Sequence, residues 1–188
     1  MGAFETVSQF SRMLENLDAW LQAGTAYAQQ RGFDAEILTK ARLAPDQYAL
    51  VQQIQSACDA AKFAAAYLAG QKAPPHPDTE TTVAELRSRI TTCVAYLKTF
   101  KAADFTGAEE RRVAPPWMGG KSVRGDVYIQ RISVPNFYFH VTTAYAILRH
   151  NGVEVAKHDF IGVRAWEEFG DGRNHPPPSV PPTGSLAC

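Results

Sequence analysis

Residues 45–69 read PDQYALVQQIQSACDAAKFAAAYLA. Apolar or small side chains recur in this stretch at alternating intervals of three and four residues: Val51, Ile54, Cys58, Ala61, Ala65 and Leu68. This spacing places them on one face of an α-helix. A stripe of this regularity is typical of a helix that packs against other helices in a bundle.

Residues 82–100 repeat the same rhythm. The apolar positions are Val83, Leu86, Ile90, Cys93, Leu97 and Phe100. Thr82 and Glu85 have the spacing of a capping box, in which each residue satisfies a backbone N–H group at the start of a helix. We therefore expect a second helix here, and we expect the two helices to pack through their stripes.

Two further segments have helical periodicity. Residues 4–30 place four apolar side chains on one face and should end at Gly32, a residue that favours the left-handed helix end: Phe10, Leu14, Leu17 and Leu21. Residues 126–150 do the same before Asn151 and Gly152: Phe137, Val141, Ala144 and Leu148. Pro135 either kinks one long helix or lies in the first turn of a shorter helix capped by Ser133. Residues 34–40 predict a short connecting helix.

The remaining segments are connections. Residues 71–78 form a proline-containing link between the second and third long helices. Residues 111–124 predict a long crossover or a small hairpin before the last helix, because Val113 and Val123 flank a Gly-Gly turn. The sequence thus predicts an all-α four-helix bundle over residues 1–163. Residues 164–188 predict a Pro/Gly-rich tail that is disordered or extended.

Composition excludes several classes of protein. The chain has 188 residues with 19 basic and 19 acidic side chains, and no helix is rich in basic residues, so we expect no nucleic-acid binding. No run approaches the roughly 18 uninterrupted apolar residues of a membrane span. The three cysteines form no CxxC pair and the N-terminus lacks the features of a secretory signal, which predicts reduced thiols and a cytoplasmic location.

Two polar residues border the predicted core and are candidate metal ligands. His140 follows Phe137 by three residues, and Asp59 lies beside Cys58. A carboxylate and an imidazole that converge inside a bundle could hold a divalent metal or bind a polar ligand. The alternative is structural: His140 hydrogen-bonds a backbone carbonyl or Asp59, and Asp59 pairs locally with Lys62.

A resemblance adds to this interpretation. It rests on the run from Pro135 to Arg149, PNFYFHVTTAYAILR, which is followed by Asn151 and Gly152, and on the segments RLAPD at 42–46 and DTETT at 78–82. Over residues 4–162 the chain resembles an uncharacterised domain-of-unknown-function family of the DinB/YfiT-like superfamily. The resemblance implies a four-helix bundle that is often dimeric, among relatives described as proposed metalloenzymes, some of them metal-dependent thiol transferases or hydrolases.

In metal-binding relatives, as the resemblance implies, the second bundle helix supplies one histidine and the last helix supplies a His-x-x-x-His pair. His140 matches the first residue of that pair, Ala144 stands at the second position, and the predicted second helix has no histidine. The first hypothesis is a protein of unknown role with a pocket for zinc, nickel, iron or an unknown small molecule at His140 and Asp59. The alternative is a non-catalytic binding or homodimerisation module whose outer aromatic residues, such as Tyr138 and Tyr145, contact the partner.

Overall fold

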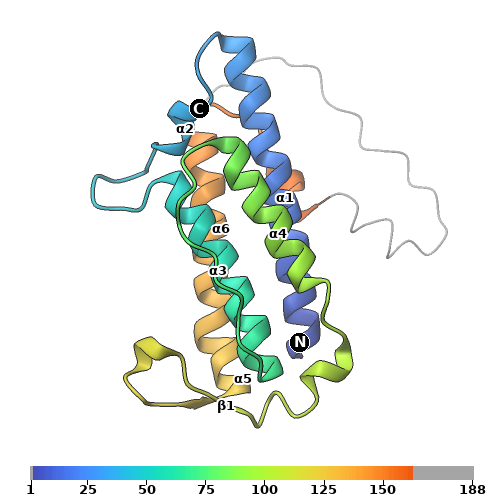
Figure 1. Ribbon diagram of the computed structural model, residues 1–188. Helices are drawn as coiled ribbons and strands as arrows, with labels where there is room; N and C mark the ends of the chain where they lie inside the picture. Colours follow the sequence, from blue (N-terminus) through green and yellow to red (C-terminus); the bar gives the residue numbers. More distant parts are fainter. Residues whose placement is uncertain (1, 163–188) are drawn as a thin grey trace, which may run out of the picture.

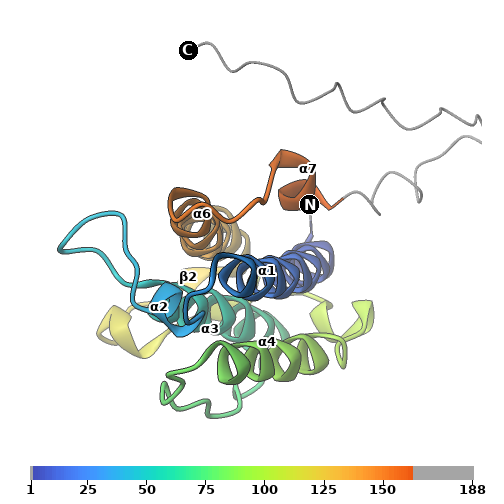
Figure 2. The same cartoon turned by 90° about the horizontal axis from the view of Figure 1, so that it is seen from above.

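The computed structural model describes residues 2–162, and regular structure in this part of the chain is almost entirely helical (Figure 1). Its four long helices are α1 (Ala3–Arg31), α3 (Leu50–Ala69), α4 (Val83–Leu97) and α6 (Val134–His150). They lie side by side, with α4 and α6 on opposite sides of α1 and α3 (Figure 2). The predicted all-α fold is therefore confirmed.

The core lies between these helices and is built from the predicted stripes. Every stripe residue of α1 and α6 is buried, as is every stripe residue predicted for residues 82–100. The stripe of α3 is also buried except at Val51, which is half-buried. The thiol of Cys93 donates to the carbonyl oxygen of Cys58 at 3.3 Å, which joins α4 to α3 as the two patterns predicted.

The helix ends follow local chemistry. Thr82 accepts from the backbone N–H of Glu85, and Glu85 accepts from that of Thr82, so the predicted capping box is present. Gly32 ends α1 with a φ of 74°, a left-handed conformation that favours glycine. The first residues of the stretch 45–69 form turns, because the chain folds through the short helix α2 (Glu36–Thr39) and a connection before α3 begins.

The last long helix is continuous around Pro135. A short helix α5 (Gly125–Tyr128) leads into a π-helical turn (Ile129–Ser133), which leads directly into α6. Proline has no N–H to donate and its ring crowds the carbonyl four residues earlier, so a wider turn accommodates it. Ser133 makes no capping hydrogen bond, and the alternative of a shorter helix capped by Ser133 is therefore wrong.

The connections carry three smaller features. The two-residue strands β1 (Arg112–Val113) and β2 (Val123–Arg124) pair antiparallel with Val113 opposite Val123, which confirms the small hairpin. Single 3₁₀ turns occupy Ala102–Phe105 and Pro116–Met118. The helix α7 (Lys157–Ile161) packs on α1. The predicted tail, 164–188, lies outside the described residues.

No helix within residues 2–162 has both the length and the apolar content needed to cross a membrane.

Candidate functional site

His140 lies on α6 and is held by α3. Its Nδ1 atom is 2.8 Å from Oε1 of Gln53, whose side chain is completely buried. An amide oxygen only accepts, so the imidazole Nδ1–H donates and the ring nitrogen Nε2 is left as an acceptor. The amide nitrogen of Gln53 donates in turn to the carbonyl oxygen of Tyr48 at 3.2 Å. His140 thus takes part in a chain of hydrogen bonds that ties α6 to the start of α3.

The surroundings of His140 favour the neutral ring. Burial lowers the pKa of His140 from its ordinary value, because the imidazolium ion would lose hydration without gaining a carboxylate partner. The ring of Phe139 meets the imidazole edge to face, with 5.3 Å between the ring centroids. These features suit a structural histidine that links two helices, and the same neutral state leaves Nε2 able to accept a hydrogen bond.

Asp59 faces a different neighbour. Its Oδ1 atom lies 2.7 Å from Nζ of Lys62 and 2.9 Å from Nη2 of Arg89 on α4. The local Asp59–Lys62 pair is the one that the structural alternative predicted. Asp59 follows Gln53 by six residues, which displaces it by about 9 Å along the axis of α3. His140 and Asp59 therefore have separate partners, and no hydrogen bond or ion pair joins them within residues 2–162.

Arg89 is the centre of a polar cluster that the sequence did not predict. Its side chain is only 2% exposed, and its terminal nitrogens lie 2.9–3.0 Å from carboxylate oxygens of three residues: Asp59, Asp78 and Glu80. Gln55 on α3 donates to Glu80 at 2.9 Å. The cluster therefore joins α3, α4 and the link between them. The sequence did carry one indication that Arg89 is buried: it directly precedes the core residue Ile90 and follows the core residue Leu86 by three positions.

The charged forms are stable in this cluster because each has partners. Burial acts to raise the pKa of Glu80, but hydrogen bonds from Gln55, the backbone and Arg89 outweigh it and hold this pKa below its ordinary value. Burial likewise acts to lower the pKa of Arg89, and the hydrogen bond to Glu80 with the nearby carboxylates raises it instead. At neutral pH the cluster is therefore a network of ion pairs.

The donors do not fit the metal site that the sequence suggested. No group of three His, Cys, Asp or Glu side chains among residues 2–162 could hold a metal ion. Near His140, the facing residue of α3 is an amide, Gln53, and Ala144 has only a buried methyl group. A catalytic zinc site takes three protein ligands. Metal binding by His140 and Asp59 stays a prediction.

Comparison with known proteins shows similarity to a family model and to a solved structure. A family model described as a domain of unknown function, DUF1993, matches residues 4–161. The crystal structure of a DinB family member protein from Shewanella denitrificans has 43% sequence identity and a TM-score of 0.82. That match covers 92% of this chain and 95% of the other. The search of curated proteins found no match.

Proposed function

This chain belongs to the DUF1993 family with a DinB-like fold, and we propose that it is a non-catalytic module that pairs with a second copy of itself. The contact is the outer face of α6 and the adjoining Tyr48. The observation that carries the proposal is that the outer face of α6 has no charged residue before Arg149, and that the side chain of Phe139 on this face is 55% exposed.

The outer face of α6 has an unusual composition for a surface helix. No Asp, Glu, Lys or Arg occurs between Ile132 and Leu148. The solvent-facing positions in that range are neutral: Pro135, Asn136, Phe139 and Thr142. Surface helices ordinarily carry charged residues on this face, as α4 does at Glu85. Depletion of charge with an exposed aromatic side chain is the composition of a protein interface.

A second aromatic side chain extends this surface. Tyr48 is also 55% exposed, and its carbonyl oxygen accepts from Gln53, which binds His140. The ring of Phe139 packs edge to face on the His140 ring. Tyr48 and Phe139 are thus each connected to the Gln53–His140 pair, and we name them, with the outer face of α6, the aromatic surface. Large aromatic side chains supply much of the binding energy of interfaces.

Tyr138 and Tyr145, which the sequence predicted as partner contacts, are partly buried and also pack against the core. The hydroxyl of Tyr145 donates to the carbonyl oxygen of Val155 at 3.2 Å, and its ring packs edge to face on Trp20. Tyr138 packs against Phe10 in the same way. The partner surface that we propose is therefore centred on Phe139.

A second copy is the partner that suits the aromatic surface. In a two-fold dimer the same patch meets itself, so it must be complementary to itself. A patch with charges of one sign would repel its copy, whereas the part of the outer face of α6 that precedes Arg149 carries no charge. The whole chain has 19 basic and 19 acidic side chains, so long-range repulsion between copies is also small.

The test is sedimentation velocity over a range of protein concentrations. Thr142→Glu places a charge on the aromatic surface, and Thr91→Glu places the same charge at an exposed position of α4 on the opposite side. We expect the wild type and Thr91→Glu to dimerise and Thr142→Glu to stay monomeric. A wild type that is monomeric at every concentration, or equal dimerisation of both variants, contradicts the proposal.

The competing hypothesis places a divalent metal or a small ligand at His140. Its support is the resemblance together with the Nε2 acceptor that the hydrogen bond to Gln53 leaves on the ring. Elemental analysis of untagged protein purified without chelator distinguishes the two. Near-stoichiometric zinc, nickel or iron that His140→Ala abolishes supports a metal ligand, whereas metal-free folded protein supports the structural role.

A further inference from the structure

The aromatic surface is too small to hold a dimer by itself. It consists of Tyr48 and the outer face of α6, on which four positions before Arg149 are exposed: Pro135, Asn136, Phe139 and Thr142. A stable interface between two proteins takes about 20–30 residues from each partner. A second copy must therefore also contact elements beside this surface.

Two segments project from the bundle on one side (Figure 1 and Figure 2). One is the connection 40–48, which leads into the first turn of α3 at Leu50. The other is the hairpin 112–124, and the residue before it, Arg111, donates to the carbonyl oxygen of Leu68 at the far end of α3. Because α3 has 20 residues, the two projections are separated by roughly 30 Å along the bundle.

The outer face of α6 lies between the two projections. The hairpin is followed by α5 and the π-helical turn, which lead into α6, so α6 begins near the hairpin. It passes close to the connection where His140 meets Gln53, three residues after Leu50. The connection, the aromatic surface and the hairpin therefore occupy one side of the molecule.

Both projections expose large apolar side chains. Trp117 in the hairpin is 68% exposed, and no large hydrophobic side chain within residues 2–162 is more exposed. Leu43 and Tyr48 in the connection are 44% and 55% exposed. Tryptophan and tyrosine are enriched among the residues that contribute most to binding at interfaces. An exposed tryptophan on a projecting hairpin is therefore a candidate anchor for a partner.

Local contacts already order both projections. In the hairpin, Val113 is buried and pairs with Val123, and Arg124 donates to two carboxylates. In the connection, Arg42 donates to the carbonyl oxygen of Pro45 at 3.3 Å. A segment that is ordered before binding loses less conformational entropy when it binds. These projections are therefore suited to contact a partner without rearrangement.

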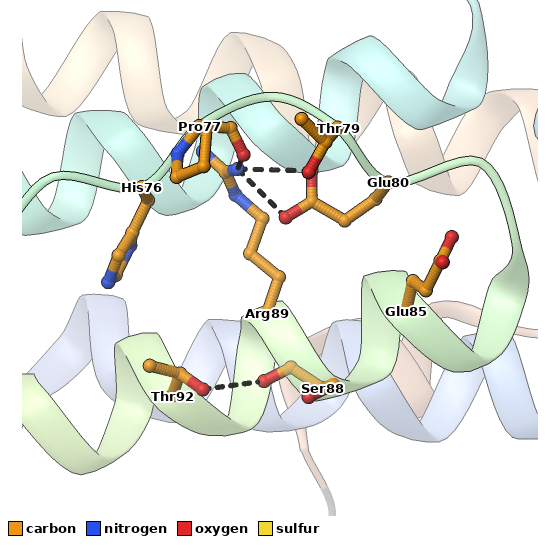
Figure 3. Close-up of a pocket in the computed structure, with 8 residues that line it drawn as sticks. All are labelled: His76, Pro77, Thr79, Glu80, Glu85, Ser88, Arg89 and Thr92. Atoms are coloured by element: carbon orange, nitrogen blue, oxygen red, sulfur yellow. Dashed lines mark hydrogen bonds and ion pairs between the residues drawn. The ribbon is translucent and has the colours of Figure 1, made fainter.

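The opposite side of the molecule is polar instead. A hollow of about 280 Å³ lies there between α4 and the link before it, and Figure 3 shows Arg89 and Glu80 bound to each other at its wall. Among residues 2–162, none of the exposed large hydrophobic side chains belongs to α4. The apolar contacts that a partner needs are therefore on the side of the two projections.

The charges of the hairpin bear on how two copies meet. Residues 112–124 include three basic side chains and no acidic one. Two of these, Arg112 and Lys121, have no ion pair within residues 2–162. Two hairpins placed together would bring four such cations into one contact, and like charges in an interface repel. The connection 40–48 has an exposed carboxylate, Asp46, beside its own two cations, so it repels the hairpin less.

We propose that, in the dimer, the hairpin of each copy packs against the connection of the other. This inference rests on the proposed dimer and adds its orientation: the two bundles lie antiparallel, related by a two-fold axis perpendicular to them. That axis places the hairpin, at one end of α3, beside the partner's connection, at the other end of its α3. Trp117 then contacts the partner's Leu43 and the partner's Tyr48, and the contact occurs twice.

Cross-linking between two different variants tests the orientation. Cys188→Ser removes the third cysteine, and Cys58 and Cys93 are completely buried. On this background Ser122→Cys places a thiol on the hairpin and Gln47→Cys places one on the connection. In an equimolar mixture, a short bismaleimide should join these two variants, and it should join either variant to itself much more slowly.

The failure of the orientation and the failure of the dimer give different results. Cross-linking of Ser122→Cys to itself that is as fast as in the mixture means that the hairpins meet, which overturns the proposal. No cross-link at a concentration where sedimentation shows a dimer overturns it as well. A wild type that is monomeric at every concentration instead removes the dimer itself, and the orientation with it.

Trp117→Ala tests the anchor, and Ile161→Ala is its control. Both side chains are exposed, and Ile161 belongs to α7, which lies away from the hairpin (Figure 2). In sedimentation, Trp117→Ala should weaken dimerisation by about tenfold or more, whereas Ile161→Ala should leave it unchanged. Equal dimerisation of the two variants overturns the proposal. If Trp117→Ala then also loses binding to anionic lipid vesicles that the wild type binds, the hairpin is a lipid contact instead.

Discussion

The Asp59–Lys62 pair provides a direct test of how burial changes the value of an ion pair. Its N···O distance is 2.7 Å, and the Lys62 side chain is 2% exposed. The pair Lys98–Glu15 has nearly the same distance, 2.6 Å, but its side chains are 62% and 47% exposed. The two pairs therefore match in N···O distance and differ strongly in solvent access, and Asp59 differs further because it also pairs with Arg89.

The expected magnitudes follow from that difference. Asp59→Ala leaves the Lys62 ammonium group buried without a carboxylate, which costs about 3–5 kcal/mol in the free energy of unfolding. Arg89 keeps its ion pairs with Glu80 and Asp78 in this variant, so it contributes less to the loss of stability than Lys62 does. Glu15→Ala leaves Lys98 in water, and the loss should be about 0–1 kcal/mol.

Urea unfolding followed by circular dichroism measures both losses at one fixed protein concentration and pH 7. Adding Lys62→Met to Asp59→Ala should recover most of the stability, because methionine keeps much of the packing volume and removes the unpaired charge. The reasoning is refuted if Asp59→Ala costs no more than Glu15→Ala. It is equally refuted if Lys62→Met restores nothing.

Three further predictions use smaller changes. The pKa of Glu85 falls from 4.5 to about 2 on folding. Its carboxylate therefore stabilises the fold fully above pH 4.5, and this contribution is lost as pH falls toward 2. In urea titrations, Glu85→Gln should reduce the loss of stability over this pH range. The pKa of His140 lies below its unfolded value of 6.5, so the unfolded chain binds more protons than the folded chain. The free energy of unfolding should therefore fall as pH drops below 6.5. An NMR titration of the His140 ring checks the direction of the pKa shift. A Cβ on Gly125 would lie 1.9 Å from the carbonyl oxygen of Ala108, so Gly125→Ala should cost about 1–3 kcal/mol in thermal unfolding. Gly24→Ala is the control. Its Cβ would meet only the ends of the Leu38, Leu148 and Val153 side chains, the nearest at 3.3 Å, so this helix-interior change should gain up to about 1 kcal/mol.

The sequence predicted the helices because burial along a helix is a local pattern. Ile54, Cys58 and Ala61 recur with the helical period, and all three are completely buried. The Asp59–Lys62 pair could also be predicted from the sequence, since residues three apart on a helix are neighbours. The π-helical turn before Pro135 could not be predicted, because it depends on how the chain widens a turn rather than on a residue pattern.

The polar cluster was beyond sequence reasoning for a different physical reason. Arg89 meets Asp59 only because α3 and α4 pack at one rotation, and it meets Glu80 only because the link lies across both helices. The rotation of a helix within a bundle is set by all its core contacts together. Gln53 raises the same difficulty, since its partner His140 is 87 positions away and a buried amide gives no periodic signal.

Gln53 also explains why the resemblance to metal-binding relatives need not imply a metal. The resemblance implies a histidine on the second helix of such relatives, whereas here the residue of α3 that faces His140 is an amide at 2.8 Å. One direct hydrogen bond then joins the two helices, and Ala144 contributes no further ligand. Metal that supports a fold makes stability depend on its concentration. We therefore expect excess EDTA to leave the urea midpoint unchanged, whereas His140→Ala should lower it by leaving the buried Gln53 oxygen unpaired, at a cost of about 1–3 kcal/mol. A midpoint that falls in EDTA and recovers with added zinc would show that a metal, and not the amide, joins these helices.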